Sequence, residues 1–120
     1  LHPDRLFPVD TNTREMAREL YALVKNAPII SPHGHTDPAW FAKNESFGDP
    51  VSLLIIPDHY VLRMLYSQGH RMEDFGVLPR NSKASIDKRK IWRLFATNFH
   101  LFRGTPSALW LKHVFHEVFL

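Results

Sequence analysis

The sequence predicts a mainly α-helical chain with one short β-strand. In several segments apolar residues recur at intervals of three and four, which is the periodicity of amphipathic helices. Helix-starting residues such as Asp-Pro, Thr-Pro, Asp and Ser precede most of these segments. Only residues 29–35 combine a short apolar run with an extended pattern. The chain has 120 residues, 44% of them hydrophobic and 22% charged, so it is about one domain and can bury a core.

The composition excludes several classes of protein. The chain has no cysteine, which excludes disulfides and thiolate metal sites and agrees with a cytoplasmic location. No apolar run approaches the ~18 residues that a membrane helix needs, and no signal-peptide pattern opens the chain. The net charge of +3 is modest, and a local basic cluster predicts a solvated helix face, because no nucleic-acid recognition motif accompanies it. The cluster comprises Lys83, Lys88, Arg89, Lys90 and Arg93.

We expect six helices along the chain. Residues 10–13 are good N-cap types for the first helix, and Asn12 and Glu15 have the spacing of a capping box, although the box proper begins with Ser or Thr. Asn26 and Pro28 end this helix just before the strand. Ser85 is the expected N-cap of the fifth helix. A half-turn is also expected near residues 72–75. The six predicted helices cover approximately residues 11–25, 38–41, 51–56, 59–68, 86–99 and 106–118.

The predicted strand ends in two histidines one residue apart, which suggests a metal site. In extended backbone, His33 and His35 project from the same face with Cα atoms about 6.5–7 Å apart. One zinc ion with Zn–N bonds of about 2.0–2.1 Å can bridge them. The alternative is a pair of surface histidines in a loop. A catalytic zinc usually has three protein ligands and a strand needs neighbours, so we expect the chain to be part of a longer polypeptide.

A second group of polar side chains follows Asp58. On a helix, Arg63 is adjacent to both His59 and Tyr60, because residues three and four apart share a face. Arginine can bind a carboxylate, while histidine and tyrosine can bind hydroxyl groups. The residues alone favour the simpler interpretation, a helix start with Tyr60 packed and Arg63 on the surface. A pair of histidines near the C-terminus, His113 and His116, is likewise interpreted as ordinary helix residues.

Three segments together resemble the N-terminal part of the uronate (glucuronate) isomerase family, a divergent branch of the amidohydrolase superfamily. The segments are IISPHGH at Ile29–His35, PDHYVLR at Pro57–Arg63 and FRGTPS at Phe102–Ser107, followed by Trp110, Leu111 and His113. The resemblance implies that the chain is an N-terminal fragment of a distorted (β/α)8, TIM-type barrel. Residues 1–35 would hold the lead-in, the first helix and the first barrel strand, and residues 36–120 a helical insertion.

The resemblance also implies an activity for the full-length protein, the aldose–ketose isomerisation of D-glucuronate to D-fructuronate and of D-galacturonate to D-tagaturonate. His33 and His35 match two ligands of a divalent metal, which we expect to be zinc. Tyr60 matches a catalytic tyrosine that moves a proton between C1 and C2, and His59 matches a substrate-binding histidine. The remaining ligands and arginines of the family are expected after Leu120, so the 120-residue chain alone should be inactive.

Two alternatives stay open from the sequence. One is another metal-dependent hydrolase of the amidohydrolase type, against which the Asp58-His59-Tyr60 segment argues. The other is a non-catalytic helical interaction module in which the histidines are incidental. The expected partner is a small sugar acid, with no nucleic acid and no membrane, and the sequence leaves open whether the protein forms a homo-oligomer.

Overall fold

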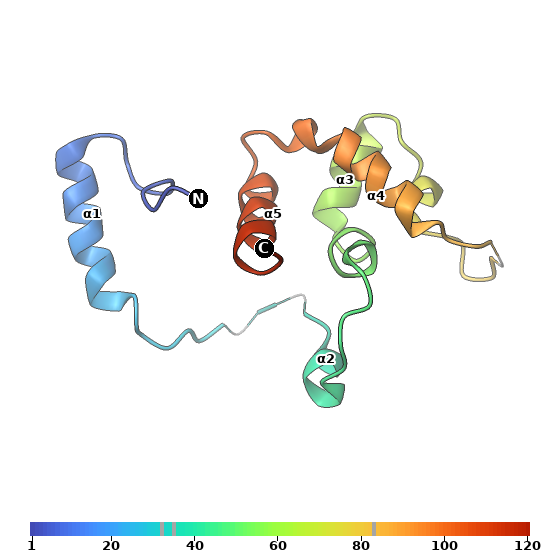
Figure 1. Ribbon diagram of the computed structural model, residues 1–120, viewed down its shortest axis with the longest axis horizontal. Helices are drawn as coiled ribbons and strands as arrows, with labels where there is room; N and C mark the ends of the chain where they lie inside the picture. The colour runs from blue at the N-terminus through green and yellow to red at the C-terminus, as the bar shows by residue number, and fades with distance from the viewer. Residues whose placement is uncertain (32, 35, 83) are drawn as a thin grey trace. The chain divides into compact units, whose positions relative to one another are not determined.

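The regular elements of the chain are all helical in the computed structural model, which describes residues 1–31, 33–34, 36–82 and 84–120 (Figure 1). The predicted mainly α-helical class is therefore confirmed. No helix in these ranges is both long and apolar enough to cross a membrane. The elements are α1 (Thr11–Val24), α2 (Pro38–Lys43), the π-helix η1 (Val51–Ile55), α3 (His59–Ser67), the 3-10 helix η2 (Met72–Phe75), α4 (Lys88–Thr97), the 3-10 helix η3 (Phe99–Phe102) and α5 (Pro106–Glu117).

The β-strand predicted at residues 29–35 is wrong for the part of that stretch that the structure describes. Residues 29–31, 33 and 34 have no regular secondary structure, while Pro32 and His35 lie outside the described residues. Ile29 and Ile30 are 93% and 89% exposed. A strand satisfies its backbone groups by pairing with a neighbour, and no described segment supplies one.

The chain forms two compact units, Leu1–Asn44 and Glu45–Leu120. In the first unit, the lead-in packs against α1, where Phe7 contacts Tyr21 with ring centroids 6.1 Å apart. Asp10, rather than Asn12, is the N-cap of α1, and its carboxylate accepts a 2.8 Å hydrogen bond from the backbone N–H of Thr13. Asp10 precedes the first turn directly, so its carboxylate reaches the N–H of Thr13, whereas a capping box at Asn12 would have used the N–H of Glu15.

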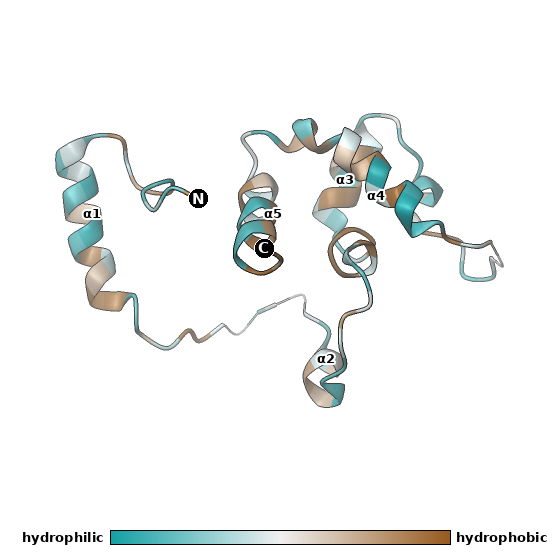
Figure 2. Cartoon of the chain, viewed as in Figure 1, coloured by the Kyte–Doolittle hydropathy of each residue, from teal (hydrophilic) through white to brown (hydrophobic). Residues whose placement is uncertain are grey.

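The apolar face of α1 is uncovered in this unit. No residue of α1 is buried, and Met16, Leu20 and Leu23 are 60%, 63% and 82% exposed. Figure 2 shows the apolar residues of α1 gathered toward its last turns. The periodicity that predicted this helix is therefore present without a surface that buries it within Leu1–Asn44.

The second unit holds the hydrophobic core, which draws on η1, α3, η2, α4, η3 and α5. Phe95 lies among other aromatic rings, with ring centroids 5.5 Å from Trp92, 5.6 Å from Phe99 and 5.9 Å from Phe102. The core fixes how α3 and the start of α5 lie relative to each other. Its buried side chains are Val51, Leu54, Ile55, Val61, Leu62, Leu65, Phe75, Ile91, Phe95, Phe102, Ala108 and Leu111.

Polar side chains cap the helices of this unit. The Thr105 hydroxyl accepts from the N–H of Ala108 at 3.2 Å, as the Thr-Pro signal predicts. The prediction of Ser85 as the N-cap of the fifth helix is wrong, because α4 begins at Lys88 and Asp87 caps it. The Asp87 carboxylate accepts from the N–H of Lys90 at 3.0 Å. A carboxylate also interacts favourably with the positive end of the helix dipole, which favours Asp87 over the serine two residues earlier.

Candidate active site

The histidine segment lies in the first unit. His33 is exposed, and its carbonyl oxygen accepts a 2.8 Å hydrogen bond from the Ser31 hydroxyl. His35, the other predicted ligand, lies outside the described residues, so the predicted pair has no geometry here. Within the described part of the chain, no three His, Asp or Glu side chains lie close enough together to hold a metal ion.

The Asp-His-Tyr segment begins α3 in the second unit. Asp58 is the N-cap, and its carboxylate accepts from the backbone N–H groups of Tyr60 at 2.8 Å and Val61 at 3.2 Å. This cap fixes the first turn, which places His59 and Tyr60 at the exposed end of the helix. The two rings touch, with centroids 4.2 Å apart.

Arg63 lies beside Tyr60, as the three-residue spacing predicts. Its guanidinium carbon is over the Tyr60 ring, 5.3 Å from the ring centroid. Arg63 is exposed, as the simpler interpretation of this segment predicted. The same interpretation was wrong about Tyr60, which is 56% exposed instead of packed. The buried residues of α3 are Val61, Leu62 and Leu65, so the apolar contacts of this helix come from positions after Tyr60.

A pocket of about 590 Å³ lies between α3 and the start of α5, with Tyr60 at its wall. Two of the three motif segments, residues 57–63 and 102–107, therefore meet at one place. The hydroxyls of Ser67 and Thr105 already donate to the carbonyls of Met64 and Phe102, each at 2.7 Å. The lining residues are Tyr60, Arg63, Met64, Ser67, Phe102, Thr105, Pro106 and Ser107.

Part of this lining was missed in the sequence. Thr105 and Ser107 were interpreted as a helix start, because nothing local shows that the start of α5 faces α3. Met64 and Ser67 had a usable signal, since they follow Tyr60 at four and seven residues and so share its helix face. A pocket formed by two segments about forty residues apart depends on tertiary packing, and helical spacing predicts only the α3 side of it.

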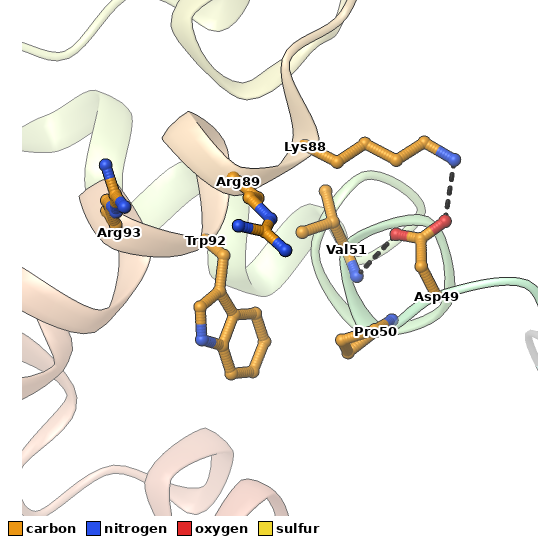
Figure 3. Close-up of a pocket in the computed structure, with 7 residues that line it drawn as sticks. All are labelled: Asp49, Pro50, Val51, Lys88, Arg89, Trp92 and Arg93. Atoms are coloured by element: carbon orange, nitrogen blue, oxygen red, sulfur yellow. Dashed lines mark hydrogen bonds and ion pairs between the residues drawn. The ribbon is translucent and has the colours of Figure 1, made fainter.

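A second pocket, of about 390 Å³, lies between the start of η1 and α4 (Figure 3). Lys88 donates from Nζ to Oδ2 of Asp49 at 2.6 Å. The members of the basic cluster that the structure describes are exposed, which confirms the predicted solvated face, and Lys83 lies outside the described residues. None of the three motif segments reaches this pocket. It is lined by Asp49, Pro50, Val51, Lys88, Arg89, Trp92 and Arg93.

His113 and His116 do not form a metal site in the described structure. Both are exposed on α5, and Nδ1 of His116 lies 3.1 Å from Oε1 of the adjacent Glu117. This agrees with their interpretation as ordinary helix residues. The pocket beside Tyr60 is therefore the candidate site in the second unit.

Comparison with known proteins identifies the family. The family model described as glucuronate isomerase matches residues 9–119, nearly the whole chain. The chain belongs to the glucuronate isomerase family. The predicted resemblance is thereby confirmed.

Proteins described as uronate isomerases are highly similar to this chain. A uronate isomerase of Brucella suis biovar 1 is 59% identical over 120 residues, covering 99% of this chain and 26% of that protein. A uronate isomerase of Xanthomonas axonopodis pv. citri is 60% identical over 121 residues, covering 99% of this chain and 25% of that protein. The chain thus spans about one quarter of the length of these relatives.

A solved structure of the same family has the same fold over this region. The crystal structure of glucuronate isomerase from Caulobacter crescentus superposes with a TM-score of 0.91 at 58% sequence identity. The match covers 99% of this chain and 25% of that protein. The helices described above therefore correspond to about one quarter of a glucuronate isomerase chain. The roles predicted for His33, His35, His59 and Tyr60 stay predictions.

Proposed function

We propose that this chain is part of a cytoplasmic uronate isomerase that interconverts D-glucuronate with D-fructuronate and D-galacturonate with D-tagaturonate. The observation that carries the proposal is the match of residues 9–119 to the glucuronate isomerase family. Because the chain covers about one quarter of its relatives, the activity belongs to the family-length polypeptide. We expect the 120-residue chain alone to be inactive.

The proposed fold of that longer polypeptide is a distorted (β/α)8 barrel, in which residues 36–120 form a helical insertion. Residues 29–35, whose described part forms no strand in this chain, would become the first barrel strand only where neighbouring strands of the longer polypeptide pair with them. The exposure of Ile29 and Ile30 supports this assignment. Strands of a parallel barrel are covered on both faces, so an apolar run of this kind requires neighbours. Active sites of such barrels lie at the carboxyl ends of the strands, where residues 33–35 would be.

A zinc ion is the proposed cofactor, with His33 and His35 as two of its ligands. Imidazole nitrogens are favoured zinc ligands, and the exposed His33 lies in a segment without regular secondary structure. The described residues do not complete a ligand set, so the other ligands would come from the rest of the polypeptide. When bound, the metal would supply Lewis-acid polarisation of the sugar's oxygen atoms.

Tyr60 is the proposed catalytic residue and His59 the proposed substrate-binding residue. Isomerisation of an aldose to a ketose moves a proton from C2 to C1 and another between the two oxygens, through an enediol. A tyrosine that acts as the base takes the C2 proton on its phenolate oxygen and, as the phenol, returns it to C1. Tyr60 suits the role because its exposed ring lines a pocket, and the His59 ring beside it can bind a sugar hydroxyl.

The test is turnover by the purified family-length polypeptide that contains these residues. Its zinc-loaded form should isomerise D-glucuronate, and the Tyr60→Phe variant should lose most of the kcat while keeping its zinc. The His33→Ala and His35→Ala variants should each lose bound zinc, as measured by metal analysis. As a matched control, His116→Ala should change neither turnover nor zinc content. A zinc-loaded protein without isomerase activity would refute the proposal.

A further inference from the structure

Arg63 has one distinctive contact in the second unit. Its guanidinium carbon lies 5.3 Å from the centroid of the Tyr60 ring, within the ~6 Å range of a cation–π interaction. The two residues are three apart on α3, where helical geometry brings side chains together. The Asp58 cap holds the first turn of that helix, so the contact is built into the element.

The charge of Arg63 is not used in an ion pair with any residue that the structure describes. The ion pairs of the second unit involve other residues, such as Lys88 with Asp49 and Arg71 with Glu73. Arginine side chains on a helix surface usually extend into solvent. Here the side chain is exposed and also lies along the wall of the pocket, with its guanidinium over the Tyr60 ring.

Tyr60 has few other constraints. It is 56% exposed, and the ring contacts recorded for it are those with His59 and Arg63. A catalytic group must be held within about half an ångström of its productive position. The position of an exposed tyrosine ring is set by the groups that touch the ring, because no packed core surrounds it.

We propose that Arg63 is a positioning residue for Tyr60. The guanidinium of Arg63 holds the phenol ring of Tyr60 in the orientation that faces the substrate. The proposal rests on the proposed function, because it assigns Tyr60 to proton transfer. Arg63 acts through the tyrosine and does not itself contact the substrate. Its removal should therefore affect the chemical step and leave substrate binding unchanged.

The experiment compares Arg63→Met and Arg63→Lys in the family-length polypeptide with D-glucuronate as substrate. Met keeps the length of the side chain and removes the charge, whereas Lys keeps a cation that can still lie over the ring. A cation–π contact at an exposed site is worth a factor of about two to five. We expect Arg63→Met to lower kcat by about that factor with KM unchanged, and Arg63→Lys to recover most of the loss.

A spectroscopic measurement tests the contact without turnover. With 3-fluorotyrosine incorporated, the ¹⁹F signal of position 60 is assigned by its absence in Tyr60→Phe. Arg63→Met should shift this signal and leave that of Tyr21, on α1, in place. The control Arg80→Met removes an exposed cation outside the pocket and should change neither the signal nor kcat.

The two proposals fail in different ways. No turnover by the unsubstituted protein refutes the proposed function. Normal turnover combined with an Arg63→Met variant of unchanged kcat and unchanged ¹⁹F signal refutes the role of Arg63. A raised KM at unchanged kcat also refutes it, because that result makes Arg63 a substrate ligand instead of a positioning residue.

Discussion

The ion pair between Asp49 and Lys88 joins the start of η1 to the start of α4, and its removal should destabilise the second unit measurably. Oδ2 of Asp49 accepts from Nζ of Lys88 at 2.6 Å (Figure 3). Oδ1 of the same carboxylate caps η1, accepting from the N–H groups of Val51 at 3.0 Å and Ser52 at 2.9 Å. Asp49→Asn keeps a carbonyl oxygen for the cap and removes the charge, while Lys88→Met removes only the cation.

The size of the effect follows from the carboxyl group and its exposure. The hydrogen bond from Lys88, followed by that from the Ser52 backbone, lowers the pKa of Asp49 from 3.8 to about 2. Without screening by solvent, a pKa lowered by that much would contribute roughly 2.5 kcal/mol to the free energy of unfolding. The side chains of Lys88 and Asp49 are 50% and 24% exposed, so solvent screens the pair. We therefore expect a coupling energy of about 0.5–1 kcal/mol.

The pH dependence has a definite direction. The folded-state pKa lies below the unfolded one, so the charged carboxylate stabilises the unit at pH values above about 4. This contribution is lost as the pH falls from about 4 toward 2 and the folded protein takes up the proton. Asp49→Asn has no such group, so its stability difference from the wild type should shrink over this range.

The assay is a double-mutant cycle measured by urea unfolding of the 120-residue chain, followed by tryptophan fluorescence. Wild type, Asp49→Asn, Lys88→Met and the double variant are compared at pH 7 and near pH 2. High salt, about 1 M, should reduce the coupling at pH 7. A coupling that is zero at pH 7, or equal at both pH values, would contradict the electrostatic origin assigned to this contact.

Two further substitutions, each with a control variant, test the core by the same unfolding measurement. Phe95→Ala removes a ring that is 2% exposed and should lower the free energy of unfolding by about 3–5 kcal/mol. The control Tyr66→Ala, at a position that is 62% exposed, should change it by less than about 0.5 kcal/mol. Similar losses for the two variants would contradict the assigned core. Gly76→Ala places a Cβ at φ +80°, 3.0 Å from Cδ1 of Ile91, and should cost about 2–3 kcal/mol from strain and crowding. Gly69→Ala, at φ +89° in open space, should cost only about 1 kcal/mol, and equal losses at the two glycines would show that crowding plays no part.

The helices were predictable because their signals are local. Asp37-Pro38, Asp58 and Thr105-Pro106 each precede a helix that begins where expected, since a cap and the first turn depend on four or five neighbouring residues. The capping box at Asn12 and the N-cap at Ser85 did not form, and the cause is the same in both places. Two competing caps lay within three residues of each other, and the aspartate prevailed in both cases.

The strand and the pocket were not predictable in the same way, because each depends on distant residues. An apolar run such as residues 29–31 becomes a strand only where a neighbour pairs with it. The contact of Arg63 with Tyr60 follows from helical spacing, and the structure confirms it. That Thr105 and Ser107 lie across the pocket from Tyr60 follows from the packing of α3, η3 and α5 around Phe102, which no local pattern encodes.

The uncovered face of α1 has a practical consequence for handling the chain. Met16, Leu20 and Leu23 are in contact with water, and the adjoining Ile29 and Ile30 are almost fully exposed. Side chains of this kind promote self-association and attract chaperones when a protein is produced. A preparation of residues 1–120 therefore calls for a solubilising fusion partner at its N-terminal side, whereas Glu45–Leu120 buries twelve apolar side chains in a core of its own.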